Sequence, residues 1–145
     1  MMEHTLFFRS EFGALSVLSI VFSFIFDVFV IVIIIRRVYV RERPTAETIF
    51  GALCVYLLIG FTFARLYAII ATVHPGAFYL DPATNHHSVA AGFDFIFFSF
   101  GTMTSLGASG IVAVSAQVRS LSVTESILGV LYLAVFISRL MDAYR

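Results

Sequence analysis

Nine consecutive residues, Thr102-Met103-Thr104-Ser105-Leu106-Gly107-Ala108-Ser109-Gly110, combine small hydroxyl side chains with glycine between two apolar segments. Such a loop offers hydroxyl and backbone oxygen atoms rather than acids or bases. In a bilayer, irregular backbone is stable only where it is buried in protein or lines a cavity. The segment therefore predicts a backbone-lined cavity at membrane depth. The alternative is tight packing between membrane helices, where runs of serine, glycine and alanine also occur.

The composition of the chain is that of a membrane protein. Of the 145 residues, 60% are apolar and the mean hydropathy is +0.99, whereas soluble domains are about 45–50% apolar. The formal net charge is +0, which argues against a nucleic-acid-binding surface. No Ser/His/Asp, metal-ligand or phosphate-loop pattern occurs in the apolar segments. We therefore expect no enzymatic activity, no cofactor and no nucleic-acid partner.

Three apolar stretches, 13–35, 50–73 and 121–140, are long enough to cross a membrane, since the hydrocarbon core of about 30 Å needs about 20 helical residues. Asp27 interrupts the first stretch and Arg65 interrupts the second. A charge inside a membrane costs at least about 2.5–3.5 kcal/mol. We interpret both residues as structural charges, paired with each other or reaching an interface. A sensor, relay or gating pair is the functional alternative.

The positions of the arginines predict how the chain crosses the membrane. Arginines occur at 36, 37, 41 and 43 and near the C-terminus at 139 and 145, whereas the connection 74–90 has none. The positive-inside rule places the basic loop and the C-terminus in the cytoplasm and 74–90 outside, with Arg9 as the exception. This topology requires that 91–118 enter and leave on the same face. The charges therefore predict a re-entrant loop there.

The order of these segments resembles one pore module of the prokaryotic two-helix potassium channels. The resemblance covers about residues 45–145 and is strongest at 93–104, FDFIFFSFGTMT. It continues in Ile111-Val112, Val114-Ser115, Arg119-Ser120-Leu121 and Leu131-Tyr132-Leu133-Ala134. In such channels, backbone carbonyl oxygens replace the hydration shell of the permeating cation.

The resemblance implies an all-α membrane protein with three transmembrane helices, a re-entrant pore helix and a filter loop. Residues 1–44 would form an accessory transmembrane helix and a basic cytoplasmic loop, and residues 45–145 the pore module. Within the module, the resemblance implies an outer helix at 45–73, an outer connection at 74–90, a pore helix at 92–103, a filter at 104–110 and an inner helix at 119–144.

By this resemblance, the ion-conducting filter consists of Thr104, Ser105, Leu106, Gly107, Ala108 and Ser109. The end of the filter departs from the T-x-T-T-V-G-Y-G pattern of the family. Ala108 replaces the bracing tyrosine, Ser109 replaces the second glycine, and Gly110 replaces the aspartate that follows. A serine with positive φ is strained by about 1 kcal/mol or more. We therefore expect weakened selectivity, with K+ as the permeant ion and Na+ as its competitor.

Three further residues of the pore module receive roles. Gly129 resembles the hinge glycine that allows the inner helix to bend during gating, and a packing glycine is the alternative. Asp94 and Glu125 are expected to be structural charges, either paired with each other or with Asp94 acting on the helix dipole. Ser122-Val123-Thr124-Glu125 matches a capping box at the start of the inner helix, although it would also fit one turn inside that helix.

These expectations combine into one functional hypothesis. The chain would form a homotetrameric channel in the lipid bilayer of a prokaryotic inner (cell) membrane, multi-pass with a cytoplasmic C-terminus, because a single loop cannot enclose an axis. It would pass monovalent cations through the filter. The alternative is a non-conducting relative of these channels that acts as a structural or regulatory membrane subunit.

Overall fold

The computed structural model describes residues 18–19, 21–34, 36, 46–85, 90–107 and 110–143. Within these residues the chain is helical apart from one short pair of strands. Their order is the helical segment Val21–Ile34, α2 (Ala46–Val73), β1 (Phe78–Leu80), α3 (Gly92–Met103), β2 (Ile111–Ala113) and α4 (Ala116–Ala143). The all-helical class expected from the sequence is therefore confirmed, while the pair of strands was not foreseen.

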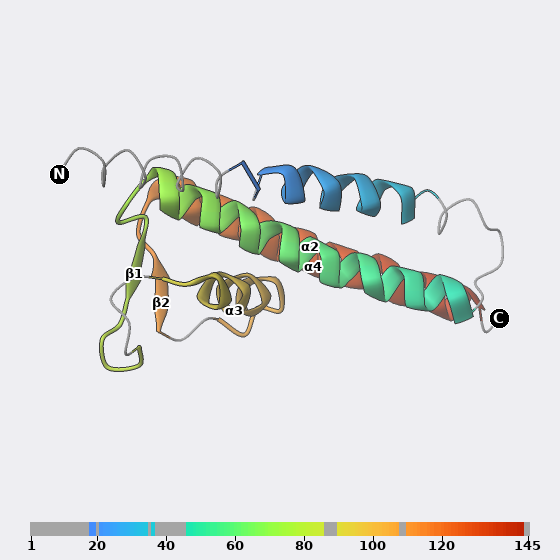
Figure 1. The fold of residues 1–145 in the computed structure, drawn as a ribbon. Coiled ribbons are helices and arrows are strands. Elements are labelled where there is room, and N and C mark those ends of the chain that lie inside the picture. Colours follow the sequence, from blue (N-terminus) through green and yellow to red (C-terminus); the bar gives the residue numbers. More distant parts are fainter. Residues whose placement is uncertain are drawn as a thin grey trace, which may run out of the picture.

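Two of the helices form the long axis of the molecule. α2 and α4 run side by side in opposite directions, so that the end of α2 and the start of α4 lie at the same end (Figure 1). The stretches Ile49–Val73 and Ala116–Met141 are long and apolar enough to span a membrane. The first predicted span is described as the shorter helix Val21–Ile34, while 13–17, 20 and 35 lie outside the described residues. A third span stays a prediction.

Between the two long helices in sequence, α3 packs against both of them near the end that carries the strands (Figure 1). Its 12 residues make a helix of about 18 Å, which is too short to cross a hydrocarbon core of about 30 Å. After α3 the chain turns back, and β2 returns it to the end at which α3 began (Figure 1). The segment from α3 to β2 is therefore a hairpin-like excursion along the long helices.

The short strands close this excursion. β1 and β2 pair antiparallel, with Phe78 opposite Ala113 and Leu80 opposite Ile111. The carbonyl oxygen of Ala77 also accepts hydrogen bonds from the amides of Val114, at 2.9 Å, and Ser115, at 3.2 Å. The residues after the loop are thus bonded to the residues after α2, which fixes the returning end of the excursion beside the end of α2.

An aromatic core lies beneath the strands and holds α3 against α2. The rings of Tyr67 and Phe98 meet edge to face with centroids 5.0 Å apart, and Phe78 contacts both Phe95 and Phe98 in the same manner. Such pairs add about 0.5–1.5 kcal/mol each beyond the area that they bury. Val118, at the start of α4, is fully buried in the same cluster. The core therefore fixes the position and direction of α3 relative to α2.

The pattern Ser122-Val123-Thr124-Glu125 lies inside α4, which was the alternative to a capping box at the start of this helix. α4 begins at Ala116, and Ser115 caps it, since the Ser115 Oγ accepts a hydrogen bond of 3.3 Å from the amide of Val118. Ser122 lies inside the helix, where its hydroxyl donates to the carbonyl of Arg119. The pattern forms no cap, and Glu125 instead contacts partners on α2 and α3.

Candidate functional site

The loop that follows α3 begins with a tightly closed helix end. The amide of Thr104 donates to the carbonyl of Phe100 at 3.0 Å, and the Thr104 hydroxyl donates to the same oxygen at 2.6 Å. The amide of Gly107 donates to the carbonyl of Gly101 at 3.0 Å. These bonds satisfy carbonyls that every helix end leaves without partners, and they hold the loop at a fixed angle to α3.

The backbone of the loop alternates in handedness. Ser105 has a φ of 60° and Gly107 a φ of 79°, whereas Leu106 between them is not in the positive region. The predicted filter residues Ser105, Leu106 and Gly107 thus form a ribbon at the tip of the excursion, in which two residues with positive φ flank one without. Ala108 and Ser109, the remaining predicted filter residues, lie outside the described residues.

Ser105 adopts a conformation that suits glycine, so Ser105→Gly should stabilise the protein slightly. The left-handed region costs a residue with a side chain about 1–2 kcal/mol, which glycine would not incur. Glycine also gains conformational freedom in the unfolded chain, which lowers the free energy of unfolding by about 0.5–1 kcal/mol. We expect a net gain of about 0.5 kcal/mol in the free energy of unfolding in detergent. Ser105→Ala is the control, because it removes the hydroxyl and keeps the strain. Stability of Ser105→Gly below that of the control would contradict the assigned conformation.

The far end of the loop is attached to the outer connection. The carbonyl oxygen of Gly110 accepts a 2.9 Å hydrogen bond from the amide of Asp81 and a 2.6 Å bond from the Asn85 Nδ2. Gly110 has a φ of 91°, and a Cβ at this position would lie 2.6 Å from the Thr84 Oγ1. Glycine is therefore required here, and the oxygen of Gly110 is engaged away from the loop tip.

The inner side of the loop meets α4. The hydroxyls of Ser105 and Ser126 lie 3.5 Å apart. One turn further along α4, Gly129 is pressed against the end of α3, and a Cβ on it would lie 2.5 Å from the carbonyl oxygen of Met103. Gly129 therefore allows a close approach of α4 to α3. Its role as a gating hinge stays a prediction.

A buried polar cluster lies at the junction of α2, α3 and α4. The Tyr67 hydroxyl donates to the Glu125 Oε2 at 2.6 Å, and the Ser99 Oγ contacts both the Glu125 Oε1 and the carbonyl oxygen of Gly60, the latter at 2.7 Å. All three side chains are fully buried, with exposed fractions of 0%. Glu125 therefore binds one long helix to the other through α3.

Asp94 has a separate, local partner. Its Oδ2 accepts a 2.7 Å hydrogen bond from the amide of Ala91, just before the start of α3. Ala91 has no side-chain acceptor to complete a full capping box. Asp94 and Glu125 thus serve different structural purposes, and the described contacts pair neither with the other.

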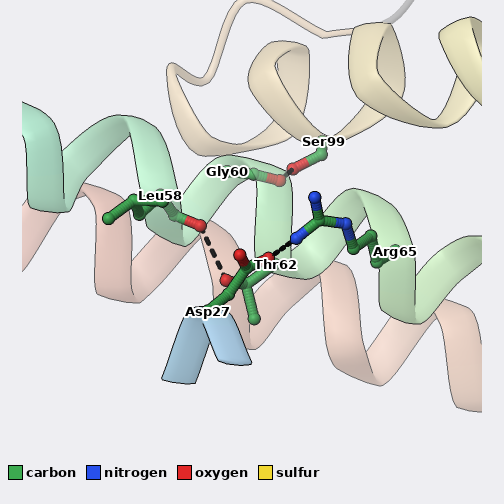
Figure 2. A network of polar contacts seen from close by, with 6 residues as sticks. All are labelled: Asp27, Leu58, Gly60, Thr62, Arg65 and Ser99. Carbon is green, nitrogen blue, oxygen red and sulfur yellow. Dashed lines mark hydrogen bonds and ion pairs between the residues drawn. The ribbon is translucent and has the colours of Figure 1, made fainter. Parts of the chain in front are cut away.

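The two predicted membrane charges meet each other. Figure 2 shows the guanidinium of Arg65, on α2, forming an ion pair with Asp27 on the helical segment Val21–Ile34. The Asp27 side chain is 7% exposed and that of Arg65 is 39% exposed. Asp27 is the single buried residue among the described side chains of its helix. The ion pair is therefore the polar attachment of this helix to α2.

Sequence reasoning missed the partners of Glu125 and the anchors of the loop. Ser99 is the only hydroxyl in the aromatic run 93–100, and a hydroxyl in such surroundings calls for a buried partner, which was the available signal. Asn85 and Ser126 carried no comparable signal, since each lies among other polar residues. Within the described part of the chain, no group of three His, Cys, Asp or Glu residues is placed to hold a metal ion.

The geometry of the loop is thus one of backbone and hydroxyl oxygens, anchored at both ends and free of charged side chains. Comparison of the chain with models of protein families, with curated proteins and with solved structures found no match.

Proposed function

We propose that four copies of this chain form a cation channel whose filter is lined by residues 104–109. The alternating ribbon at Ser105, Leu106 and Gly107 carries this proposal. In the proposed tetramer, the peptide groups of this ribbon would turn their carbonyl oxygens toward the axis, which is what a dehydrated cation requires. The C-terminal end of α3, with its partial negative charge, lies directly before this row.

The setting of the loop supports the same function. A helix too short to span lies between two helices long enough to do so, and the chain returns to the end from which it came (Figure 1). One loop cannot surround an axis, so we propose a homotetramer with the loops facing each other. The protein would lie in a prokaryotic inner membrane, with the strands outside and the C-terminus in the cytoplasm, as the arginines predict.

The surface of a single chain is consistent with a membrane protein that assembles. Large apolar side chains are exposed along both long helices and at the loop, including Leu106 at 86%, Phe93 at 75% and Met141 at 70%. Soluble monomers rarely expose so many apolar residues together. Lipid would cover the outer faces of α2 and α4, and neighbouring copies would cover the faces beside α3.

The permeant ion in this proposal is K+, with weakened discrimination against Na+. The oxygen of Gly110 is already bonded to the outer connection, so the oxygens available to an ion end at residue 109. Ala108 offers no aromatic brace behind them. Reversal potentials measured for the purified protein in opposed K+ and Na+ gradients test this, and a strongly K+-selective current would contradict the weakened filter.

Gly107→Ala should abolish most of the ion flux without unfolding the protein. A Cβ at Gly107 meets nothing within 4 Å, but its φ of 79° is unfavourable for alanine, by about 1–2 kcal/mol. This strain would rotate the peptide groups of the ribbon in every copy. We expect flux into liposomes to fall about tenfold or more, since each 1.36 kcal/mol on a barrier is a factor of about ten.

Gly76→Ala is the matched control for this experiment. Gly76 has a φ of 91° and open space around its Cβ position, so it carries the same backbone strain in the outer connection. We expect its flux to stay at the level of the unmodified protein. Equal flux for both variants would place the conducting path elsewhere. A stable tetramer with no flux in any variant would favour a non-conducting subunit, and any other oligomeric state would contradict the pore.

A further inference from the structure

The buried cluster of Tyr67, Ser99 and Glu125 contains more hydrogen bonds than its hydroxyl groups can supply. Three oxygen–oxygen contacts hold it together: Tyr67 with Glu125, Ser99 with Glu125, and Ser99 with the carbonyl of Gly60 (Figure 2 shows the last). Each contact needs one proton between its two oxygens. Tyr67 and Ser99 bring one proton each, and an ionised Glu125 would bring none.

Only one distribution of protons satisfies all three contacts. The carbonyl of Gly60 can only accept, so the proton in that contact belongs to Ser99. The proton between Ser99 and the Glu125 Oε1 must then come from Glu125, and Tyr67 donates to the Oε2. Without the third proton, two acceptor oxygens would face each other at hydrogen-bond distance inside a dry protein, which is a costly arrangement.

We propose that Glu125 is held as a neutral carboxylic acid and acts as a positioning residue, donating its proton to Ser99 and thereby fixing α3 between α2 and α4. Burial favours the neutral form, because a carboxylate without a cation is expensive in an apolar interior. Among the ionisable side chains whose contacts the structure describes, only Tyr67, from α2, touches the carboxyl group. α3 contributes Ser99, which is uncharged, and the nearby cation Arg65 is engaged by Asp27.

The proton connects two helices of the pore module to the helix that presents the loop. Ser99 lies about one turn before Met103, where α3 ends, and its hydroxyl bridges Glu125 of α4 and Gly60 of α2. A shift of this hydroxyl would move the whole of α3 and the ribbon after it. The protonation of Glu125 follows from the packing of the three helices and does not depend on whether the pore conducts. Its influence on ion selection rests on the proposed channel function.

Infrared spectroscopy of the purified full chain in lipid tests the proton directly. A neutral carboxylic acid has a carbonyl stretching band, shifted by exchange into D2O, that an ionised carboxylate lacks. We expect this band at neutral pH, its loss in Glu125→Gln, and its persistence in the matched control Asp94→Asn. A spectrum without the band, or a band that Glu125→Gln leaves unchanged, would overturn the proposal.

Stability and flux separate the neutral acid from a simple structural role. Glutamine offers one donor to Ser99 and one acceptor to Tyr67, so Glu125→Gln should fold with an unfolding temperature close to that of the unmodified protein. Glu125→Leu, similar in size but without polar atoms, should lose much of that stability. Failure of Glu125→Gln to fold would show that the charge is needed and would overturn the proposal.

The flux measurement then addresses the positioning role. We expect Glu125→Gln to keep the reversal potential of the unmodified protein and Ser99→Ala to change it. A changed reversal potential in Glu125→Gln, or an unchanged one in Ser99→Ala, would exclude the role in positioning the loop. If the unmodified protein shows no flux, the channel proposal fails while the infrared result still decides the state of Glu125.

Discussion

Gly129→Ala should destabilise the protein by about 1–3 kcal/mol, the usual cost of inserting a methyl group into a packed core. The new Cβ would lie 2.5 Å from the carbonyl oxygen of Met103 and 2.6 Å from its Cγ. Met103 is 1% exposed, so it has no free space to enter. The backbone at the end of α3 or the axis of α4 would have to move, and the loop would move with it.

The measurement is the free energy of unfolding in mixed micelles, and Gly92→Ala is its control. Gly92 is also helical, but a Cβ there meets nothing within 4 Å. Alanine is favoured over glycine in helix interiors by about 0.5–1 kcal/mol, so this is the upper limit of the gain at Gly92, the first residue of α3. The two substitutions should therefore differ in sign, although both replace a glycine in a helix. A gain in stability for Gly129→Ala would show that the helices are not in contact at this point.

A second glycine contact sharpens the comparison. At Gly60, on α2, a Cβ would lie 2.7 Å from the tip of the Phe100 ring, which is a side chain and can be shortened. Adding Phe100→Leu should therefore rescue much of the defect of Gly60→Ala. Adding Met103→Ala should rescue little of the defect of Gly129→Ala, because the closest atom belongs to the backbone. Bending at a hinge would produce no such difference.

The limits of α3 follow from the sequence. Its run of large apolar aromatic residues ends in a row of small residues, which lack the large side chains that a helix face needs to pack into the core. The helix predicted over 92–103 is the helix that the structure contains. Local pattern also identifies Gly107 as a residue suited to positive φ, and its φ of 79° agrees. These features depend on residues within one or two turns of each other, which is the range that a single sequence reveals.

Features that depend on distant partners were not predictable. Glu125 was expected to be a structural residue, in a cap of its own helix, one turn inside that helix or paired with Asp94. Its partners are Tyr67 and Ser99, which lie 58 and 26 residues away in the chain. Many sequences contain the capping-box pattern by chance. Whether Glu125 forms a cap depends on how the three helices pack, which the local pattern does not reveal. The antiparallel pairing of β1 with β2 joins Phe78 to Ala113, and three-residue strands are too short for an alternating pattern to stand out.

Arg65→Gln should detach the helical segment Val21–Ile34 and cost about 3–5 kcal/mol, the penalty for leaving one buried partner of an ion pair without the other. Asp27 would keep its charge with a side chain only 7% exposed. Asp27→Asn should cost less, about 2–3 kcal/mol, because the Arg65 side chain is 39% exposed and its long stem can carry the charge toward a polar boundary.

The double variant Asp27→Asn/Arg65→Gln distinguishes an ion pair from two unrelated charges. The double variant contains neither charge, so it should be more stable than Arg65→Gln alone. The double-mutant cycle should give a coupling energy well above the deviation of about 0.3–0.5 kcal/mol that independent sites show. Additive losses in the two single variants would mean that Arg65 does not hold the first helix. Strong coupling would instead identify Asp27 as the residue that ties this helix to α2, since none of its other described side chains is buried.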